Sequence, residues 1–231
     1  MKKQLISAAI VLSLAVPALS MAGGPTTFED KISYSMGFEV GNYFKGAGGD
    51  IKREQLIKGI EDAYSGTTPA MTSDEMLAIK KEFALKMQTL QKAKLAEMMA
   101  KNKADGEAFL AENLKKEGVV VTDSGLQYNV IQEGKGDKAI ASDTVTVEYT
   151  GTFINGEEFD STAKHGKPAT FKVGQVIPGW SEALQLMNPG SKLHLVIPSN
   201  LAYGEKGVAP HIQPNSVLVF DVELLEIAKD K

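Results

Sequence analysis

The segment from Ser73 to about Lys116 contains no proline and carries the pattern of one long helix. Thr72 or Ser73 is the expected N-cap. An apolar stripe at helical spacing marks the first half, made of Met76, Ile79, Phe83, Met87 and Leu90. The second half is polar on every side, which favours a solvent-exposed bridge between two bodies. We expect a helix of roughly 60 Å over 73–116, with Gly106 as a point of bending or interruption.

Two shorter helical patterns precede this segment, at residues 27–46 and 51–66. The first places Gly37 and Gly41 on one face, although glycine within a helix is unfavourable by roughly 1 kcal/mol relative to alanine. Either another backbone approaches this face or the helix is frayed or kinked. The two short helices are too small to cover the apolar stripe of the long helix. We therefore expect residues 23–118 to be an all-helical domain that completes its core with a second copy.

After about residue 118 the periodicity changes from that of a helix to that of strands. Runs rich in β-branched and aromatic residues predict strands within 125–134, 143–153, 169–174, 192–199 and 216–227. Asn155-Gly156 predicts a hairpin turn, and 180–187 predicts one short helix. Residues 119–231 are thus expected to be an α+β domain, an antiparallel sheet wrapped around one helix. The domain boundary is expected near 118–125.

Residues 1–22 have the features of a secretory signal peptide. Lys2 and Lys3 precede an apolar run, and small residues at Ser20 and Ala22 suit cleavage after Ala22. An uncleaved membrane anchor stays open as an alternative, because the run is almost long enough to span a bilayer. The short charged and apolar regions are typical of bacteria, so we expect the periplasm. The mature chain is expected to have no membrane span.

The composition excludes several classes of function. The formal net charge of −4 becomes −6 without the two lysines of the leader, which does not suit binding to nucleic acid. There is no cysteine, so thiol catalysis, disulfides and zinc-thiolate sites are excluded. His165, His194 and His211 lack ligand spacing, and no Ser-His-Asp pattern is evident. We expect neither a metal nor a cofactor.

The string VIPGW, residues 176–180, holds the only tryptophan of the chain. Trp180 directly follows the turn signal Pro178-Gly179, so it is either a core anchor or the floor of a small apolar pocket. Both interpretations stay open on these residues alone. Further aromatic, apolar and acidic residues accompany it in this half: Tyr149, Phe159, Asp160, Phe171, Val176, Ile177, Tyr203, Ile212 and Phe220.

The strings VEYTG, EEFDST, ATF, VIPGW, LAYGEKGVAPHI and LVFDVELLEI resemble, in order and spacing, the FKBP-type peptidyl-prolyl isomerases. This resemblance covers essentially all of 119–231. The helical half, with KISYSMGFEVGNYF and GEAFLAEN, is similar to the Mip (macrophage infectivity potentiator) and FkpA-like periplasmic branch. The resemblance implies a helical dimerisation domain, an FKBP-like sheet domain and isomerisation of X–Pro bonds in client polypeptides.

The resemblance also implies roles for individual residues. Trp180 matches the pocket floor, and the walls match Tyr149, Phe159, Phe171, Val176, Ile177 and Phe220. The Tyr203 hydroxyl and the Ile177 N–H match hydrogen-bond donors to the ligand, and Ile212 matches the apolar tip of an overhanging loop. The catalytic set is expected to be Asp160, Tyr203, Phe220 and Tyr149.

Asp160 matches a buried carboxylate of the family. It can orient Tyr149, act electrostatically on the prolyl nitrogen, or cap a turn. Two departures from the family, at Ala169 and in the loop 205–215, leave substrate preference and affinity for macrolides of the FK506/rapamycin type open.

A dry aromatic pocket can speed rotation about an X–Pro bond without covalent chemistry. The barrier of roughly 18–20 kcal/mol comes from amide resonance, and the planar amide separates more charge than the twisted one. An alternative function is a holdase chaperone or surface interaction protein, for which the isomerase pocket is secondary. Association with the outer membrane or the cell surface stays open as well.

Overall fold

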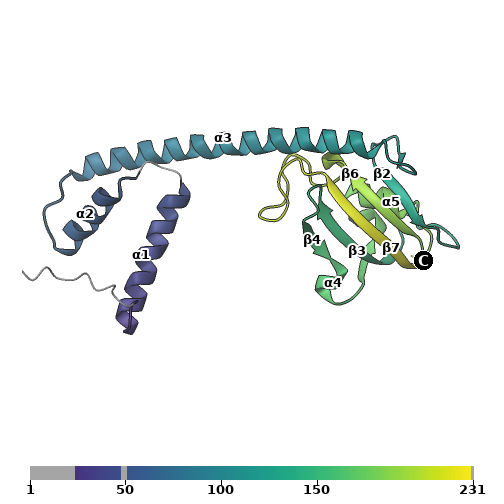
Figure 1. Cartoon of the computed structure of the whole chain (residues 1–231), viewed down its shortest axis with the longest axis horizontal. Coiled ribbons are helices and arrows are strands. Elements are labelled where there is room, and N and C mark those ends of the chain that lie inside the picture. Colours follow the sequence, from purple (N-terminus) through teal and green to yellow (C-terminus); the bar gives the residue numbers. More distant parts are fainter. Residues whose placement is uncertain (1–23, 48–50, 230–231) are drawn as a thin grey trace, which may run out of the picture. The chain divides into compact units, whose positions relative to one another are not determined.

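The computed structural model describes residues 24–47 and 51–229 (Figure 1). The expected signal peptide, 1–22, lies outside the described residues. The chain divides into two compact units, Met1–Met87 and Gln88–Lys231. None of the described helices is both long and apolar enough to cross a membrane. The expected fold class, helices followed by an antiparallel sheet with a short helix, is confirmed.

The first unit contains α1 (Phe28–Ala47), α2 (Arg53–Tyr64) and the beginning of α3 (Ser73–Asn113). Thr72 caps α3, since its hydroxyl accepts a hydrogen bond from the Glu75 N–H at 3.2 Å. In return, Glu75 Oε2 accepts one from the Thr72 N–H at 2.8 Å, which completes a capping box. The expected start of the long helix is therefore confirmed.

None of the described residues between 24 and 87 is buried. Helix α1 leaves large apolar side chains in solvent, among them Phe28, Ile32, Tyr34, Met36, Phe38, Val40 and Tyr43. At Gly37 and Gly41 an added Cβ would meet nothing within 4 Å. Within the described part of the chain, no backbone approaches these two glycines.

In residues 88–229, seven strands form one antiparallel sheet in the order β1-β2-β6-β7-β3-β4, with β5 also paired to β3. The strands and their bounds are β1 Val120–Val121, β2 Gln127–Gln132, β3 Thr144–Phe153, β4 Glu158–Ser161, β5 Ala169–Lys172, β6 Lys192–Ile197 and β7 Leu218–Ala228. The other elements are α4 Thr162–His165, η1 Val173–Gln175, α5 Pro178–Leu184 and η2 Ser199–Leu201. The five predicted strands all form, and the two that the pattern missed, β1 and β4, are short.

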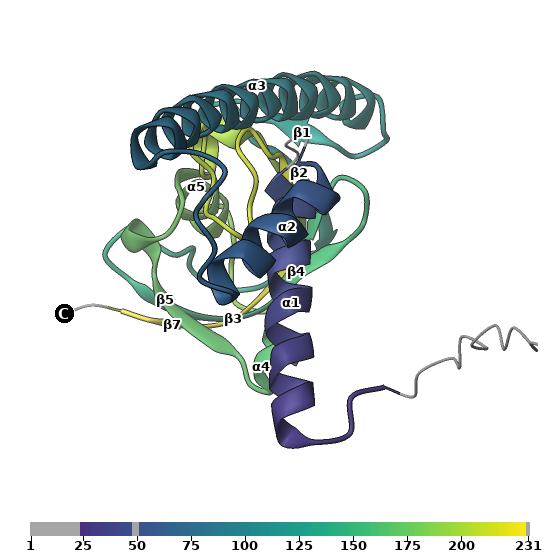
Figure 2. The ribbon, with the colours of Figure 1, turned by 90° about the vertical axis from the view of Figure 1, so that its left-hand side faces the viewer.

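Helix α5 lies inside the curve of strands β3, β5 and β7 (Figure 2). Its apolar face joins side chains of the strands in one core that contains Leu184, Leu195, Leu218 and Leu224. Alternate residues of the strands face the other side, as the period of two in a strand requires. Val196, Val217 and Val219 form a second cluster there, packed against Phe109 and Leu110 of α3.

The second half of α3 differs from its expected role as a solvent bridge. Gly106 and Asn113 are buried, and the helix continues through Gly106 without interruption. A Cβ at position 106 would lie 2.8 Å from Val217 Cγ2, so the glycine permits close approach to the sheet. Asn113 Nδ2 donates to Gln127 Oε1 at 2.9 Å. The prediction that Gly106 bends or ends the helix was wrong, because this glycine serves packing.

Candidate active site

The VIPGW string forms the entry to helix α5. Ile177 is extended at the N-cap, and Pro178 occupies the first turn, where its missing N–H costs nothing. A Cβ at Gly179 would lie 2.5 Å from Ile197 Cγ2, so only glycine lets the helix sit this close to β6. This turn brings Trp180 to the core with 5% of its surface exposed. Trp180 is both a core residue and the floor of a cavity, so the two interpretations of the sequence combine.

Aromatic rings surround this floor at right angles. The indole of Trp180 meets Tyr149 at 5.2 Å and 90°, Phe220 at 5.2 Å and 82°, and Phe171 at 5.6 Å and 81°. Phe159 meets Phe220 at 5.5 Å and 89°. Edge-to-face contacts of this kind are favourable and fix the rings mutually. We call the resulting cavity of about 510 Å³ the aromatic cup.

The aromatic cup is lined by ten residues: Tyr149, Phe159, Asp160, Phe171, Gln175, Val176, Ile177, Trp180, Tyr203 and Phe220. Nine of them were predicted from the sequence. The tenth predicted residue, Ile212, is not among these ten; it is buried in the same core cluster as Trp180 and Phe220, and its expected role stays a prediction. Gln175 was missed because a single polar residue in a short 3₁₀ turn, η1, leaves no periodic signal.

Gly151 is a further residue that sequence reasoning missed. It lies within β3, where a Cβ would stand 2.7 Å from both Phe159 Cζ and Phe220 Cε1. The two rings occupy the space that a side chain would need. A glycine in the middle of a strand signals close approach, but not which side chains approach.

Asp160 connects the wall of the cup to a histidine. The Tyr149 hydroxyl donates to Asp160 Oδ2 at 2.6 Å, and the Ser161 N–H donates to Oδ1 at 2.9 Å. The His165 Nε2 lies 2.8 Å from the same Oδ1. The carboxylate thus holds Tyr149 and accepts a backbone hydrogen bond from Ser161, the residue whose hydroxyl caps α4. The resemblance implied a buried carboxylate at this position, but 39% of the Asp160 side chain is exposed.

The electrostatics of this network keep the tyrosine neutral and the aspartate ionised. Burial raises the pKa of the Tyr149 hydroxyl, and the hydrogen bond to Asp160 raises it further. Burial works to raise the pKa of Asp160 as well, but the hydrogen bonds from Tyr149 and His165 outweigh it. The pKa of Asp160 is therefore below its ordinary value, and the pair does not exchange a proton near neutral pH.

Two hydrogen-bond donors at the rim have no acceptor within the described part of the chain: the Ile177 N–H and the Tyr203 hydroxyl. Tyr203 is 40% exposed and lies just after η2. Such donors can bind a carbonyl oxygen of a ligand. The lining contains no histidine, cysteine, serine or lysine. The described residues contain no cluster of three or more residues suited to a metal ion.

Comparisons with known proteins agree with this geometry. Residues 135–225 match the family model of the FKBP-type peptidyl-prolyl cis-trans isomerase, and residues 29–130 match the model of the domain amino-terminal to it. A protein named outer membrane protein MIP, from Legionella longbeachae, is 46% identical over 232 residues, which cover 99% of each chain. The chain belongs to the FKBP-type peptidyl-prolyl isomerases.

Other FKBP-type relatives match across both units. A peptidyl-prolyl cis-trans isomerase Mip from Coxiella burnetii is 40% identical over 228 residues, 98% of this chain and 99% of that one. The crystal structure of FkpA from Escherichia coli matches with a TM-score of 0.73 and 37% identity, covering 87% of this chain and 97% of that one. The chain is a peptidyl-prolyl cis-trans isomerase of the Mip and FkpA branch, as its sequence predicted. The roles of its individual residues stay predictions.

Proposed function

We infer that the aromatic cup binds the prolyl ring of an X–Pro segment and lowers the barrier to its rotation without forming a covalent bond. Trp180 is the floor on which the ring rests. Tyr149, Phe159 and Phe220 are walls whose ring edges carry partial positive charge, and they surround the carbonyl oxygen as it turns. The twisted amide has less separated charge than the planar one, so a water-poor cavity favours the twisted form.

The donors at the rim hold the backbone of the client in this mechanism. The Ile177 N–H and the Tyr203 hydroxyl each bind a carbonyl oxygen and fix the segment in one turn-like conformation. Asp160 acts through Tyr149, because it fixes the direction of the phenol and keeps it neutral. Contacts that improve only after the bond has turned are the ones that accelerate the reaction. A barrier lower by about 5–7 kcal/mol corresponds to roughly 10⁴- to 10⁵-fold acceleration.

The observation that carries this proposal is the set of rings standing at right angles around Trp180 in an open cavity. The test is the turnover of an X–Pro tetrapeptide by the variants Tyr203→Phe, Asp160→Leu and Phe220→Leu. Each is expected to reduce kcat/KM, with Tyr203→Phe raising mainly KM, since its hydroxyl binds rather than reacts. Wild-type rates in all three variants would overturn the assignment of these residues.

We further propose that two copies of the chain associate through α1. Two observations support this: no described residue between 24 and 87 is buried, and the face around Gly37 and Gly41 is open to a second backbone. Tyr34 and Phe38 stack on each other at 6.2 Å and offer a flat apolar surface. Light scattering at micromolar concentration is expected to give the mass of a dimer.

The proposed location is the periplasm, reached through the signal peptide expected at residues 1–22. The Legionella longbeachae relative is named an outer membrane protein, and this supports attachment to that membrane as a finer proposal to test. Fractionation of bacteria that express the full chain separates periplasmic from membrane-bound protein. Macrolides of the FK506/rapamycin type are proposed as ligands of the cup, and inhibition of tetrapeptide turnover tests this.

A holdase function is a second proposal, favoured by the apolar side chains that α1 exposes. Met36 and Tyr43 are 61% and 68% exposed in a single chain, and the part of this surface that a second copy leaves uncovered can contact apolar segments of an unfolded client. Suppression of aggregation by the Asp160→Leu variant would separate this function from isomerisation. Loss of both activities in that variant would count against an independent holdase role.

A further inference from the structure

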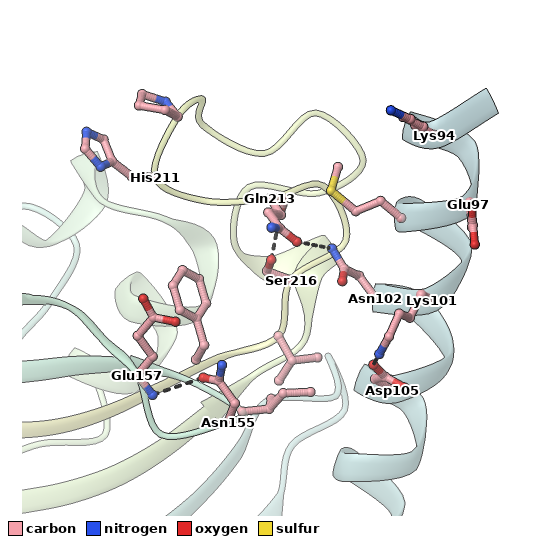
Figure 3. A pocket seen from close by; sticks show the side chains of 15 residues that line it. Lys94, Glu97, Lys101, Asn102, Asp105, Asn155, Glu157, His211, Gln213 and Ser216 are labelled. Carbon is pink, nitrogen blue, oxygen red and sulfur yellow. Dashed lines mark hydrogen bonds and ion pairs between the residues drawn. The ribbon is translucent and has the colours of Figure 1, made fainter. Parts of the chain in front are cut away.

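A second cleft lies in the sheet-containing unit, outside the aromatic cup (Figure 3). Its volume of about 740 Å³ exceeds the 510 Å³ of the cup. Three segments line it: residues 94–105 of α3, the turn 153–157 between β3 and β4, and residues 210–217 ahead of β7. We call it the helix cleft. All three segments belong to the unit Gln88–Lys231.

The walls of the helix cleft are fixed by hydrogen bonds between helix and loop. Asn102 Nδ2 donates to Gln213 Oε1 at 3.1 Å and to the Pro214 carbonyl at 2.8 Å, and Figure 3 shows Asn102 pointing at Gln213. Asn215 Nδ2 donates to the Met99 carbonyl at 3.2 Å. These bonds, with the close approach at Gly106, hold α3 against the loop. The cleft is a preformed feature of the unit, which lowers the entropic cost of binding.

The chemistry of the lining suits a polypeptide. The apolar part consists of Met98, Phe153, Ile154, Pro210 and Val217. Around it lie amides and charges of both signs, namely two lysines and three carboxylates, with Lys101 paired to Asp105. A phosphate or nucleic acid needs a positively charged site, and the lining of the helix cleft has more carboxylates than lysines. An extended chain, with alternating apolar side chains and polar amides, meets both parts of the lining.

The helix cleft and the aromatic cup adjoin at one pair of rings. Phe153 lines the cleft and Phe159 lines the cup, and their centroids are 5.0 Å apart. The loop before β7 also serves both, since it contributes Tyr203 to the cup and His211 to the cleft. An extended chain advances about 3.3–3.6 Å per residue, so a few residues are enough to pass this wall.

We propose that the helix cleft is a second subsite for the client polypeptide, occupied by the residues that flank the X–Pro bond held in the cup. This proposal rests on the proposed function of the cup. The subsite takes a short, extended, mainly apolar segment without net negative charge. It gives the enzyme a preference for long unfolded chains over short peptides, while the chemical step at the proline stays the same.

The absence of cysteine from the chain allows a reversible test. Lys94→Cys places one thiol on the cleft, and a bulky methanethiosulfonate reagent then blocks the cleft until a reductant removes it. The matched control is Leu95→Cys, because Leu95 is the next residue of α3, is 46% exposed and does not line the cleft. The substrates are an X–Pro tetrapeptide and longer peptides extended to about a dozen residues on either side of the proline. Isomerisation of each substrate is measured by exchange NMR, which needs no protease.

Extension on at least one side is expected to lower KM by about 5- to 10-fold for the wild type. Blocking the thiol of the Lys94→Cys variant is expected to abolish this gain, and the reductant is expected to restore it. The same block in the Leu95→Cys variant should leave the gain unchanged, and tetrapeptide turnover should be the same in every sample. The proposal is overturned if extension gives no gain, or if the gain survives the block at position 94. Failure of the unmodified protein to turn over the tetrapeptide would instead overturn the proposed function of the cup.

Discussion

In residues 24–87 no described side chain is buried, whereas residues 88–229 enclose a core in which Leu126, Val145, Val147 and Leu218 are fully inaccessible. The two units have similar apolar residues but place them differently. The sheet covers its apolar side chains with α5 on one face and with the last turns of α3 on the other. The helices α1 and α2 leave theirs in solvent. The contrast between a buried core and exposed helices is the reason for the proposal that a second copy covers α1.

The largest expected effect is the loss of the dimer in the Phe38→Lys variant. Phe38 is 59% exposed on α1, and a charge in a packed aromatic interface costs about 2 kcal/mol or more per site. With two copies contributing, we expect dissociation at micromolar concentration in analytical ultracentrifugation. The control is Tyr64→Lys, since Tyr64 is 91% exposed at the end of α2. A wild-type protein that is already monomeric would remove the contrast between the two units.

The next largest effect concerns two helical glycines with opposite surroundings. Gly106→Ala is expected to destabilise the sheet-containing unit by about 1–2 kcal/mol, because its Cβ would lie 2.8 Å from Val217 Cγ2 on a stiff, buried side chain. Gly59→Ala in α2 meets nothing within 4 Å and is expected to gain about 1 kcal/mol. Chemical denaturation followed by circular dichroism measures both. Stabilisation by Gly106→Ala would mean that α3 is not seated on the sheet.

A smaller effect is expected at the cup itself. Gly151→Ala forces Phe159 and Phe220 to move, because its Cβ would lie 2.7 Å from each ring. We expect kcat/KM for an X–Pro tetrapeptide to fall about tenfold, a change of about 1.4 kcal/mol in the barrier. The Gly59→Ala variant serves as the control and should retain wild-type turnover. Unchanged turnover in Gly151→Ala would show that the ring positions do not limit the reaction.

The smallest effect is a pH dependence that comes from Asp160. Because the pKa of Asp160 lies below its ordinary value, its carboxylate stays ionised between pH 5 and 8, and its stabilising contribution is lost only in stronger acid. The contact between Asp160 and His165 is 59% exposed on the histidine side, and Glu158 and Lys164 lie nearby, so solvent and these charges weaken it.

We therefore expect wild-type kcat/KM to fall about twofold only when the pH drops below 3.8, the ordinary pKa of an aspartate, because protonated Asp160 holds Tyr149 less firmly. Asp160→Asn should remove this dependence, since an amide takes up no proton in this range. The control is His194→Ala, which breaks a similar contact to Asp221 at 2.7 Å, in a pair that does not line the cup. A fall in acid that persists in Asp160→Asn would assign the pH dependence to another group.

Much of the fold follows from periodicity, and the reasons for the misses are physical. Apolar residues at helical or alternating spacing predicted the long helix and the five main strands, since these signals are local. The polar second half of α3 was misjudged, because its contact with the sheet depends on one missing side chain at Gly106 and on Val217 far along the chain. Short elements such as β1 and β4 are set by pairing with longer strands and leave little pattern of their own.

The structure brings nine of the ten predicted site residues together around the cup, and all of these except Asp160 are aromatic or apolar. Gln175, Gly151 and His165 were missed, because each matters only through a neighbour that folding brings near. His165 shows no ligand spacing in the sequence, yet it meets Asp160 across the four-residue helix α4. Ile212 was also expected at the site; it is buried in the core cluster that contains Trp180 and Phe220, and its role stays a prediction.

The single indole has a practical consequence. Trp180 is the only tryptophan of the chain and forms the floor of the cup, so its emission reports on this cavity alone. When the protein is excited at a wavelength that tyrosine does not absorb, the fluorescence of Trp180 follows occupancy of the cup without any label. Binding of an X–Pro peptide or a macrolide can then be measured by fluorescence in the unmodified protein. The helical unit contributes no tryptophan signal.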